Sequence, residues 1–182
     1  MSGPQRRPGE WVLLTYRLPR EPSTPRSAVW RKLRRLGVAQ ISDGLVALPA
    51  AARTREQLEW VAEEVTDAGG TAAIWLATPA ARAEEERLTT VMAASRAAEY
   101  QALITAAAAA AGSTSDPVAR AGIVRRLRNE LRAIQRRDYF PPPDRDLAEE
   151  AVHTLADGPG EALAASRPDA SQSRSPGPGE SP

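Results

Sequence analysis

Residues 38–48 read VAQISDGLVAL and decide the fold of the first half of the chain. Two short apolar runs, 38–41 and 45–48, flank the dipeptide Asp43-Gly44. Asp-Gly between such runs favours a tight turn, because glycine adopts the positive φ that hairpin turns require. Glycine before the stretch and proline after it mark its ends. The stretch therefore predicts two adjacent antiparallel strands.

A strand and a helix lie on each side of this hairpin. Residues 11–18 (WVLLTYRL) and 71–76 (TAAIWL) are short, apolar runs bounded by Pro or Gly, which is typical of buried strands. Thr24-Pro25 predicts a helix start, and this helix ends at Gly37. The spacing Thr54-x-x-Gln57 predicts a capping box that opens a second helix.

The resulting order is β-α-β-β-α-β, which predicts an α+β fold of the ferredoxin-like type. Such a domain is a four-stranded antiparallel sheet with both helices on one face. The other face must be covered, or it becomes a binding surface or a dimer interface.

The second half of the chain is predicted to be helical. A long alanine-rich helix over about 80–111 and a helix capped by Asp116-Pro117 form a long C-terminal α-helical hairpin, followed by a short helix near 146–155. The predicted divisions are a flexible N-terminus (1–9), the ferredoxin-like domain (10–79), the helical extension (80–156) and a disordered tail rich in Pro, Gly and Ser (157–182).

Composition excludes several classes of chemistry. The chain has no cysteine and one histidine, His153, so disulfides, zinc–thiolate sites and histidine-rich metal sites are excluded. It has no glycine-rich phosphate loop and no convincing catalytic triad. No run approaches the ~20 apolar residues of a membrane span. We expect a cytoplasmic protein that is not an enzyme and has no cofactor, no metal and no membrane contact.

The charge is distributed unevenly along the chain. Residues 1–143 carry 21 Arg and Lys against 15 Asp and Glu, a net charge of +6, whereas residues 144–182 carry 3 against 8, a net charge of −5. Arginine contributes nearly all of the positive charge, and its planar fork makes bidentate contacts to phosphate and other oxyanions. The basic segment 1–143 predicts an anionic partner.

Two helices concentrate these arginines. The predicted helix 24–36 carries a basic patch, and four arginines in the predicted helix 117–138 share one stripe at i, i+3, i+7 and i+11. Either helix could bind phosphates, present a solvated face or, for the second helix, pair with the acidic run 84–86. The predicted nucleic-acid or oxyanion contacts are Arg17, Arg20, Arg31, Lys32, Arg34, Arg35, Arg125, Arg128, Arg132 and Arg136.

The four tryptophans are predicted to serve packing. Trp11 and Trp75 lie on predicted strands and are expected in the core. Trp30 and Trp60 flank the apolar stripes of their helices, where they could fill an interface or a pocket.

Over about residues 10–140, the chain resembles the N-terminal domain of ChrB-type chromate-resistance regulators. The resemblance rests on several motifs in one order, which makes it specific. These motifs are residues 11–23 (WVLLTYRLPREPS), 29–37 (VWRKLRRLG), 48–60 (LPAAARTREQLEW), 68–70 (AGG) and 136–140 (RRDYF).

The resemblance implies a non-enzymatic transcriptional regulator of chromate resistance that controls a chromate efflux transporter. Its implied partners are the promoter DNA of that transporter and chromate as an effector. A homodimer is also expected, because a small domain with long helices reads a palindromic site best as a pair. Two alternatives remain open on the residues: a protein-interaction module, and an oxyanion (chromate) binding protein that makes no DNA contact.

Overall fold

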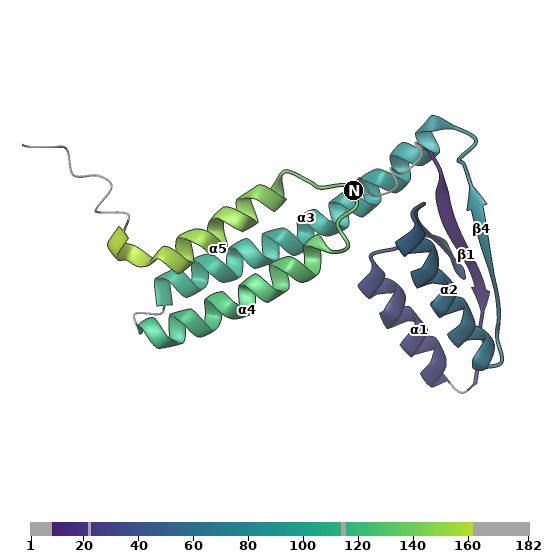
Figure 1. Cartoon of the computed structure of the whole chain (residues 1–182), viewed down its shortest axis with the longest axis horizontal. Helices are drawn as coiled ribbons and strands as arrows, with labels where there is room; N and C mark the ends of the chain where they lie inside the picture. Colours follow the sequence, from purple (N-terminus) through teal and green to yellow (C-terminus); the bar gives the residue numbers. More distant parts are fainter. Residues whose placement is uncertain (1–8, 22, 114–115, 162–182) are drawn as a thin grey trace, which may run out of the picture.

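The computed structural model describes residues 9–21, 23–113 and 116–161. Residues 1–8 of the predicted flexible N-terminus and 162–182 of the predicted disordered tail lie outside the described residues. The described part has two regions, which we call the body and the arm (Figure 1).

The body contains one four-stranded antiparallel sheet and two helices, which confirms the mixed α+β class. The strand order is β2-β3-β1-β4, and the two helices lie together on one side of the sheet (Figure 1). The elements are β1 (Trp11–Arg17), α1 (Ser23–Leu36), β2 (Ala39–Ser42), β3 (Leu45–Pro49), α2 (Ala52–Asp67) and β4 (Thr71–Ala77).

The predicted hairpin is confirmed: β2 and β3 pair antiparallel across the turn at Asp43-Gly44. Gly44 has φ +73°, and its carbonyl oxygen accepts a hydrogen bond of 2.7 Å from the backbone N–H of Tyr16. A β-carbon at Gly44 would lie 2.4 Å from the carbonyl oxygen of Tyr16. The turn therefore needs glycine for both its conformation and its close approach to β1.

The two faces of the sheet differ in exposure. Val12 and Leu14 on β1 are fully buried in the body core, whereas Leu13 and Thr15 point to the opposite face and are only partly buried. Trp75 pairs with Leu13 and so shares that opposite face, where it is 57% exposed. The prediction that Trp75 belongs to the core is wrong, because strand periodicity alone does not tell which face receives the helices.

The start of α2 differs from the predicted capping box. The N-cap is Ala51, so Thr54 lies inside the first turn and is 3% exposed. Its hydroxyl accepts a hydrogen bond from the N–H of Ala51 at 3.0 Å and donates to the carbonyl oxygen of Pro49 at 2.6 Å. Thr54 thus caps from within the helix and ties α2 to the end of β3.

The arm is a three-helix bundle rather than the predicted helical hairpin. α3 (Arg82–Ser113) begins at the body and continues into the arm, where α4 (Pro117–Gln135) and α5 (Asp144–Glu161) pack along it (Figure 1). The predicted cap of α4 is confirmed, since Asp116 accepts hydrogen bonds from the backbone N–H groups of Val118 and Ala119. No helix in the described part of the chain has the length and hydropathy needed to cross a bilayer.

α5 completes the core of the arm. It is longer than the predicted short helix, and it reaches Glu161, inside the region predicted to be disordered. It buries its small and branched side chains against α3 and α4, because an alanine-rich pair of helices alone buries little apolar area. The principal buried residues of the arm are Tyr100, Leu103, Ala107, Val124, Leu127, Leu131, Ile134, Ala148, Val152 and Leu155.

Replacing Gly44 by Ala should destabilise the body by about 3 kcal/mol, because it adds a backbone clash to the cost of a left-handed conformation. Gly69 is the matched control, since it has φ +75° and no atom within 4 Å of the point that a β-carbon would occupy. Gly69→Ala should cost only about 1 kcal/mol. Urea unfolding followed by circular dichroism measures the loss of stability in each variant. Equal losses in the two variants would contradict the close approach of Gly44 to Tyr16.

Candidate functional site

Helix α1 turns its arginines outward. Val29 and Leu33 are 3% and 0% exposed, so they mark the buried face of the helix. Residues on the opposite face of an amphipathic helix point to solvent. Arg31, Arg34 and Arg35 are exposed, and none of them forms an ion pair within the described residues. The neighbouring Lys32 differs, because it pairs with Glu64 on α2. α1 therefore offers three free guanidinium groups rather than the four predicted cations.

A first depression lies between the end of β1 and α1. It has a volume of about 780 Å³ and is lined on its basic side by Arg17, Arg20 and Arg26. Trp30 and Gln40 line its other end. One Nη of Arg26 donates hydrogen bonds to two carbonyl oxygens of the connector after β1, at 3.3 and 3.0 Å, which holds that connector against α1.

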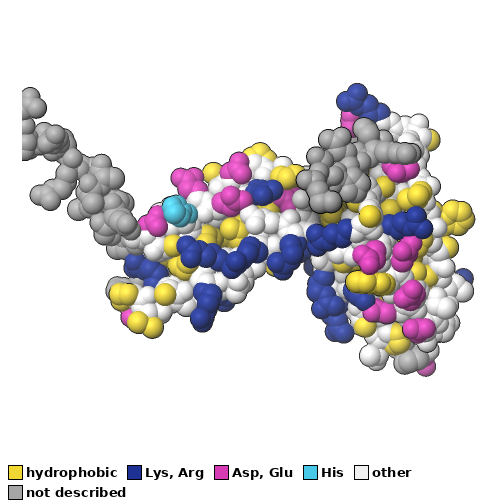
Figure 2. All heavy atoms as spheres, viewed as in Figure 1, with side chains coloured by type: hydrophobic (Ala, Val, Ile, Leu, Met, Phe, Trp, Pro, Cys, Tyr) yellow, Lys and Arg dark blue, Asp and Glu magenta, His cyan; other side chains and the backbone are white. Residues whose placement is uncertain are grey.

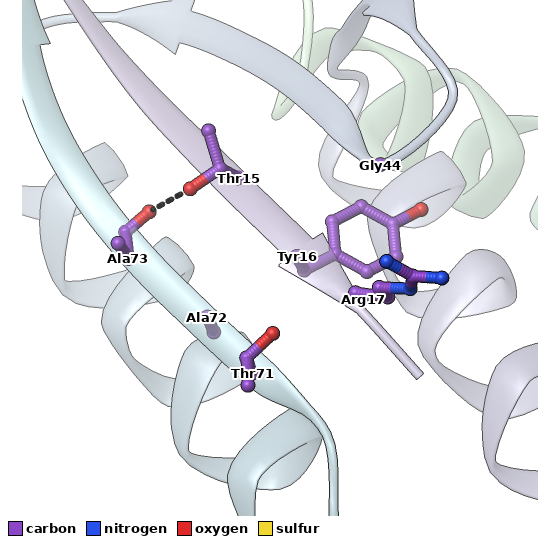
Figure 3. Close-up of a pocket in the computed structure, with 7 residues that line it drawn as sticks. All are labelled: Thr15, Tyr16, Arg17, Gly44, Thr71, Ala72 and Ala73. Atoms are coloured by element: carbon purple, nitrogen blue, oxygen red, sulfur yellow. Dashed lines mark hydrogen bonds between the residues drawn. The ribbon is translucent and has the colours of Figure 1, made fainter. Parts of the chain in front are cut away.

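The first depression continues around the end of β1 into a shallow recess, shown in Figure 3. Tyr16, Arg17 and Gly44 line both hollows. Thr15 is held to β4 by a hydrogen bond of 3.3 Å to the carbonyl oxygen of Ala73 (Figure 3). Burial, with a smaller effect of Asp43, raises the pKa of Tyr16, so its hydroxyl remains a hydrogen-bond donor.

A second depression, of about 570 Å³, lies where the body meets the arm. Trp30 and Gln40 line it as well, so it adjoins the first depression. The three free arginines of α1 line this depression. Arg96 of α3 and Arg137, which follows α4, line it as well, together with Glu99.

Arg96 and Arg137 share the single carboxylate of Glu99. Arg96 donates to Oε1 of Glu99 at 3.0 Å, and Arg137 donates to the same oxygen at 2.8 Å while its second Nη lies 2.8 Å from Oε2. Arg96 is 7% exposed, and burial lowers its pKa, an effect that the Glu99 charge opposes. The negative charge of Asp138 also acts on Arg96, so two carboxylates face the two guanidinium groups.

The same region locks the arm onto the body, and we call the contact set around it the joint. A β-carbon at Gly37 would lie 2.7 Å from Nη1 of Arg96 and 3.0 Å from the carbonyl oxygen of Arg137. Tyr139 donates a hydrogen bond of 3.2 Å to the carbonyl oxygen of Leu36, at the C-terminus of α1. The joint consists of Leu36, Gly37, Arg96, Glu99, Arg137 and Tyr139.

A third depression, of about 310 Å³, connects the joint to the C-terminal end of the arginine stripe. Arg35 and Arg137 line both it and the second depression. Arg53 of α2 and Arg136, the last arginine of the stripe, complete its basic lining. We call the three adjoining depressions the arginine groove.

The α4 stripe lies on the solvent side of the arm. Arg125, Arg128, Arg132 and Arg136 are exposed, and none forms an ion pair within the described residues. The predicted pairing with the acidic run 84–86 is wrong, because Glu84 pairs with Arg87 and Glu86 with Arg82, both on α3 itself. In Figure 2, Lys and Arg side chains run along the arm and continue onto the adjoining side of the body.

The structure brings six of the ten predicted contacts into the lining of the arginine groove: Arg17, Arg20, Arg31, Arg34, Arg35 and Arg136. It removes Lys32, which is paired, and it adds four arginines that sequence reasoning did not place in the site. Arg137 could have been found from the RRDYF motif, but isolated Arg53 and Arg96 stand in helical segments with no distinguishing pattern. The added residues are Arg26, Arg53, Arg96 and Arg137.

Comparison with known families adds one finding. Residues 26–111 match the family described as Protein ChrB, N-terminal, which confirms the resemblance inferred from the sequence. No curated protein and no solved structure is significantly similar to the chain.

Replacing Glu99 by Gln should loosen the joint, because it leaves Arg96 and Arg137 facing each other without their shared anion. Glu99 is about one third exposed, so we expect a loss of about 1–3 kcal/mol, less than the penalty for breaking a fully buried pair. The control Glu86→Gln removes an exposed i,i+4 pair and should cost under about 0.5 kcal/mol. Thermal and urea unfolding measure both, and equal effects would contradict the role of Glu99.

Proposed function

Because its segment 26–111 matches the ChrB N-terminal family, we propose that the protein is a non-enzymatic transcriptional regulator of chromate resistance that binds DNA through the arginine groove. The family implies a regulator associated with chromate resistance. The mode of action, the DNA contact and a homodimeric state are our proposal. We also propose that the body is ferredoxin-like, since its strand order and one-sided helices fit that arrangement.

The observation that carries the proposal is the continuity of arginine side chains from the body to the arm, most of which form no ion pair within the described residues. Shared lining residues link each depression to the next: Trp30 and Gln40 between the first two, and Arg35 and Arg137 between the last two. A phosphate backbone is a long polyanion, so it is bound best by cations spread along a line rather than gathered at one point.

The spacing on α4 supports a backbone contact. Successive stripe arginines are three or four residues apart, so they rise by about 4.5–6 Å along the helix, and the stripe spans roughly 16 Å. Several phosphates could therefore be contacted at once. Exposed arginines lose little by leaving water, because the guanidinium group is weakly hydrated and matches phosphate in its fork geometry.

The groove favours binding over catalysis. Among the residues that line its three depressions, the carboxylates are those of Asp43 and Glu99. Glu99 is engaged by two arginines, which keeps it from serving as a general base.

An interaction module without DNA contact has less support. That alternative required the arginines of α4 to be neutralised by the acidic run 84–86, whose residues Glu84 and Glu86 are paired within α3 instead. The free arginines leave the positive surface open to an external anion.

Replacing Arg31, Arg34 and Arg35 together by Ala should weaken binding to a labelled duplex on the order of 100-fold at low salt. The salt dependence should also fall, with the slope of log K against log salt reduced by about 2–3, because each lost phosphate contact removes about one counterion. Fluorescence anisotropy between about 50 and 200 mM salt measures both the affinity and its salt dependence. The two duplexes to compare are promoter DNA of a chromate transporter and a scrambled sequence. The stoichiometry of the complex tests the homodimer.

The matched control replaces three arginines that are each held in an i,i+4 ion pair: Arg55, Arg82 and Arg145. Both triple variants lower the net charge equally, so only the position of the lost cations differs. Equal losses in the two variants would show a diffuse charge effect, and absence of DNA binding at low salt would exclude the proposal.

A further inference from the structure

The second depression has two chemically different walls. Its volume of about 570 Å³ falls within the roughly 300–1,000 Å³ that is typical of small-molecule sites. The arginines of the lining are called its cationic wall, and the apolar side chains Trp30, Val38, Val91 and Met92 are called its apolar wall. This combination is not required for binding a phosphate backbone, which offers no apolar group to the second wall.

The apolar wall comes from three elements. Trp30 of α1 is 36% exposed beside the depression, and Val38 lies just before β2. Val91 and Met92 come from α3. Val91 is 49% exposed although it adjoins the other apolar groups, so this apolar surface is left open to water.

The cationic wall includes a buried guanidinium group. Arg96 is 7% exposed, and its Nε is buried without a hydrogen-bond acceptor among the described residues. A buried donor without an acceptor is unfavourable, so the guanidinium group of Arg96 favours an anion bound in the adjoining depression. Arg31, Arg34 and Arg137 line the same depression, and Glu99 is the carboxylate that opposes them.

We propose that the second depression binds a small organic anion, in which a phosphate, sulfonate or carboxylate group is joined to an aromatic or apolar body. The anionic group would contact Arg96 and the arginines of α1, and the apolar body would pack against Trp30 and Val91. A bare inorganic oxyanion would contact only the cationic wall. This site goes beyond the proposed DNA contact, and anion binding here does not depend on it.

Such a ligand would touch the body and the arm at once. Trp30 and Arg34 belong to α1, whereas Arg96 belongs to α3 and Arg137 follows α4. An occupied site therefore adds contacts across the joint, and it also occupies arginines that the DNA proposal uses. The ligand would act as a regulator of the same surface.

The fluorescent anion 8-anilinonaphthalene-1-sulfonate is a suitable probe, because it joins a sulfonate to aromatic rings. We expect saturable binding to the full chain without DNA, with quenching of tryptophan emission. Its neutral analogue N-phenyl-1-naphthylamine has the same rings without the charge and should bind about tenfold more weakly or worse. Equal affinity of the two probes would overturn the proposal.

Val91→Glu places a negative charge at the rim of the depression, and the position is exposed enough to tolerate it. It should weaken binding of the sulfonate by about tenfold or more, because like charges repel. Val118→Glu is the matched control on α4, where Val118 is 81% exposed and lines none of the described depressions. Unchanged binding by Val91→Glu would overturn the proposal.

A second variant keeps the test independent of folding effects. Arg34→Gln removes one cation from an exposed position of α1, and it should also weaken the sulfonate while leaving the neutral analogue unaffected. An equal loss of affinity for the sulfonate and for the neutral analogue would show that the depression does not recognise the anion. Because no DNA is present, failure of this test leaves the DNA proposal intact, and failure of DNA binding leaves this one intact.

Discussion

One carboxylate, that of Glu99, is shared by two guanidinium groups and ties the segment after α4 to α3, which itself packs into the body core through Leu88 and Met92. Glu99 pairs with Arg96 on its own helix and with Arg137 beyond the end of α4, so a single anion joins two segments far apart in the sequence. Gly37 makes this contact fit, because any side chain there would collide with Arg96 and Arg137. The C-terminus of α1 adds a further attraction, since its carbonyl groups carry partial negative charge toward the arginines.

The contacts of the joint set how the arginines of the body lie relative to those of the arm. The arginines of α1 and those of α4 belong to separate regions with separate cores. The two sets meet in the third depression, which Arg35 and Arg136 line together with Arg137 of the joint, whereas the other stripe arginines line none of the three depressions. The same contact leaves Arg96 buried with an unmatched donor and creates a cavity with one apolar wall. Structural support and ligand recognition therefore use the same few residues.

Local patterns were enough to predict the body. Asp43-Gly44 between apolar runs, and Asp116 before proline, act through turn and cap chemistry that involves only neighbouring residues. The outward direction of the α1 arginines followed from the spacing of its buried residues. The sequence could not reveal that the third helix packs along α3 and α4, nor the exposure of Trp75 or the role of Arg96. Each depends on which distant element packs against the residue, and helical or strand periodicity carries no such information.

The claim that the joint fixes both sets of arginines in one surface can be measured directly by the distance between two spin labels. The chain has no cysteine, so Glu63→Cys on α2 and Ala121→Cys on α4 would give a doubly labelled protein without background; both positions are exposed, outside the groove. Pulsed electron paramagnetic resonance should give one narrow distance distribution. A broad or bimodal distribution would show that the arm moves freely against the body, and would contradict a single preformed groove.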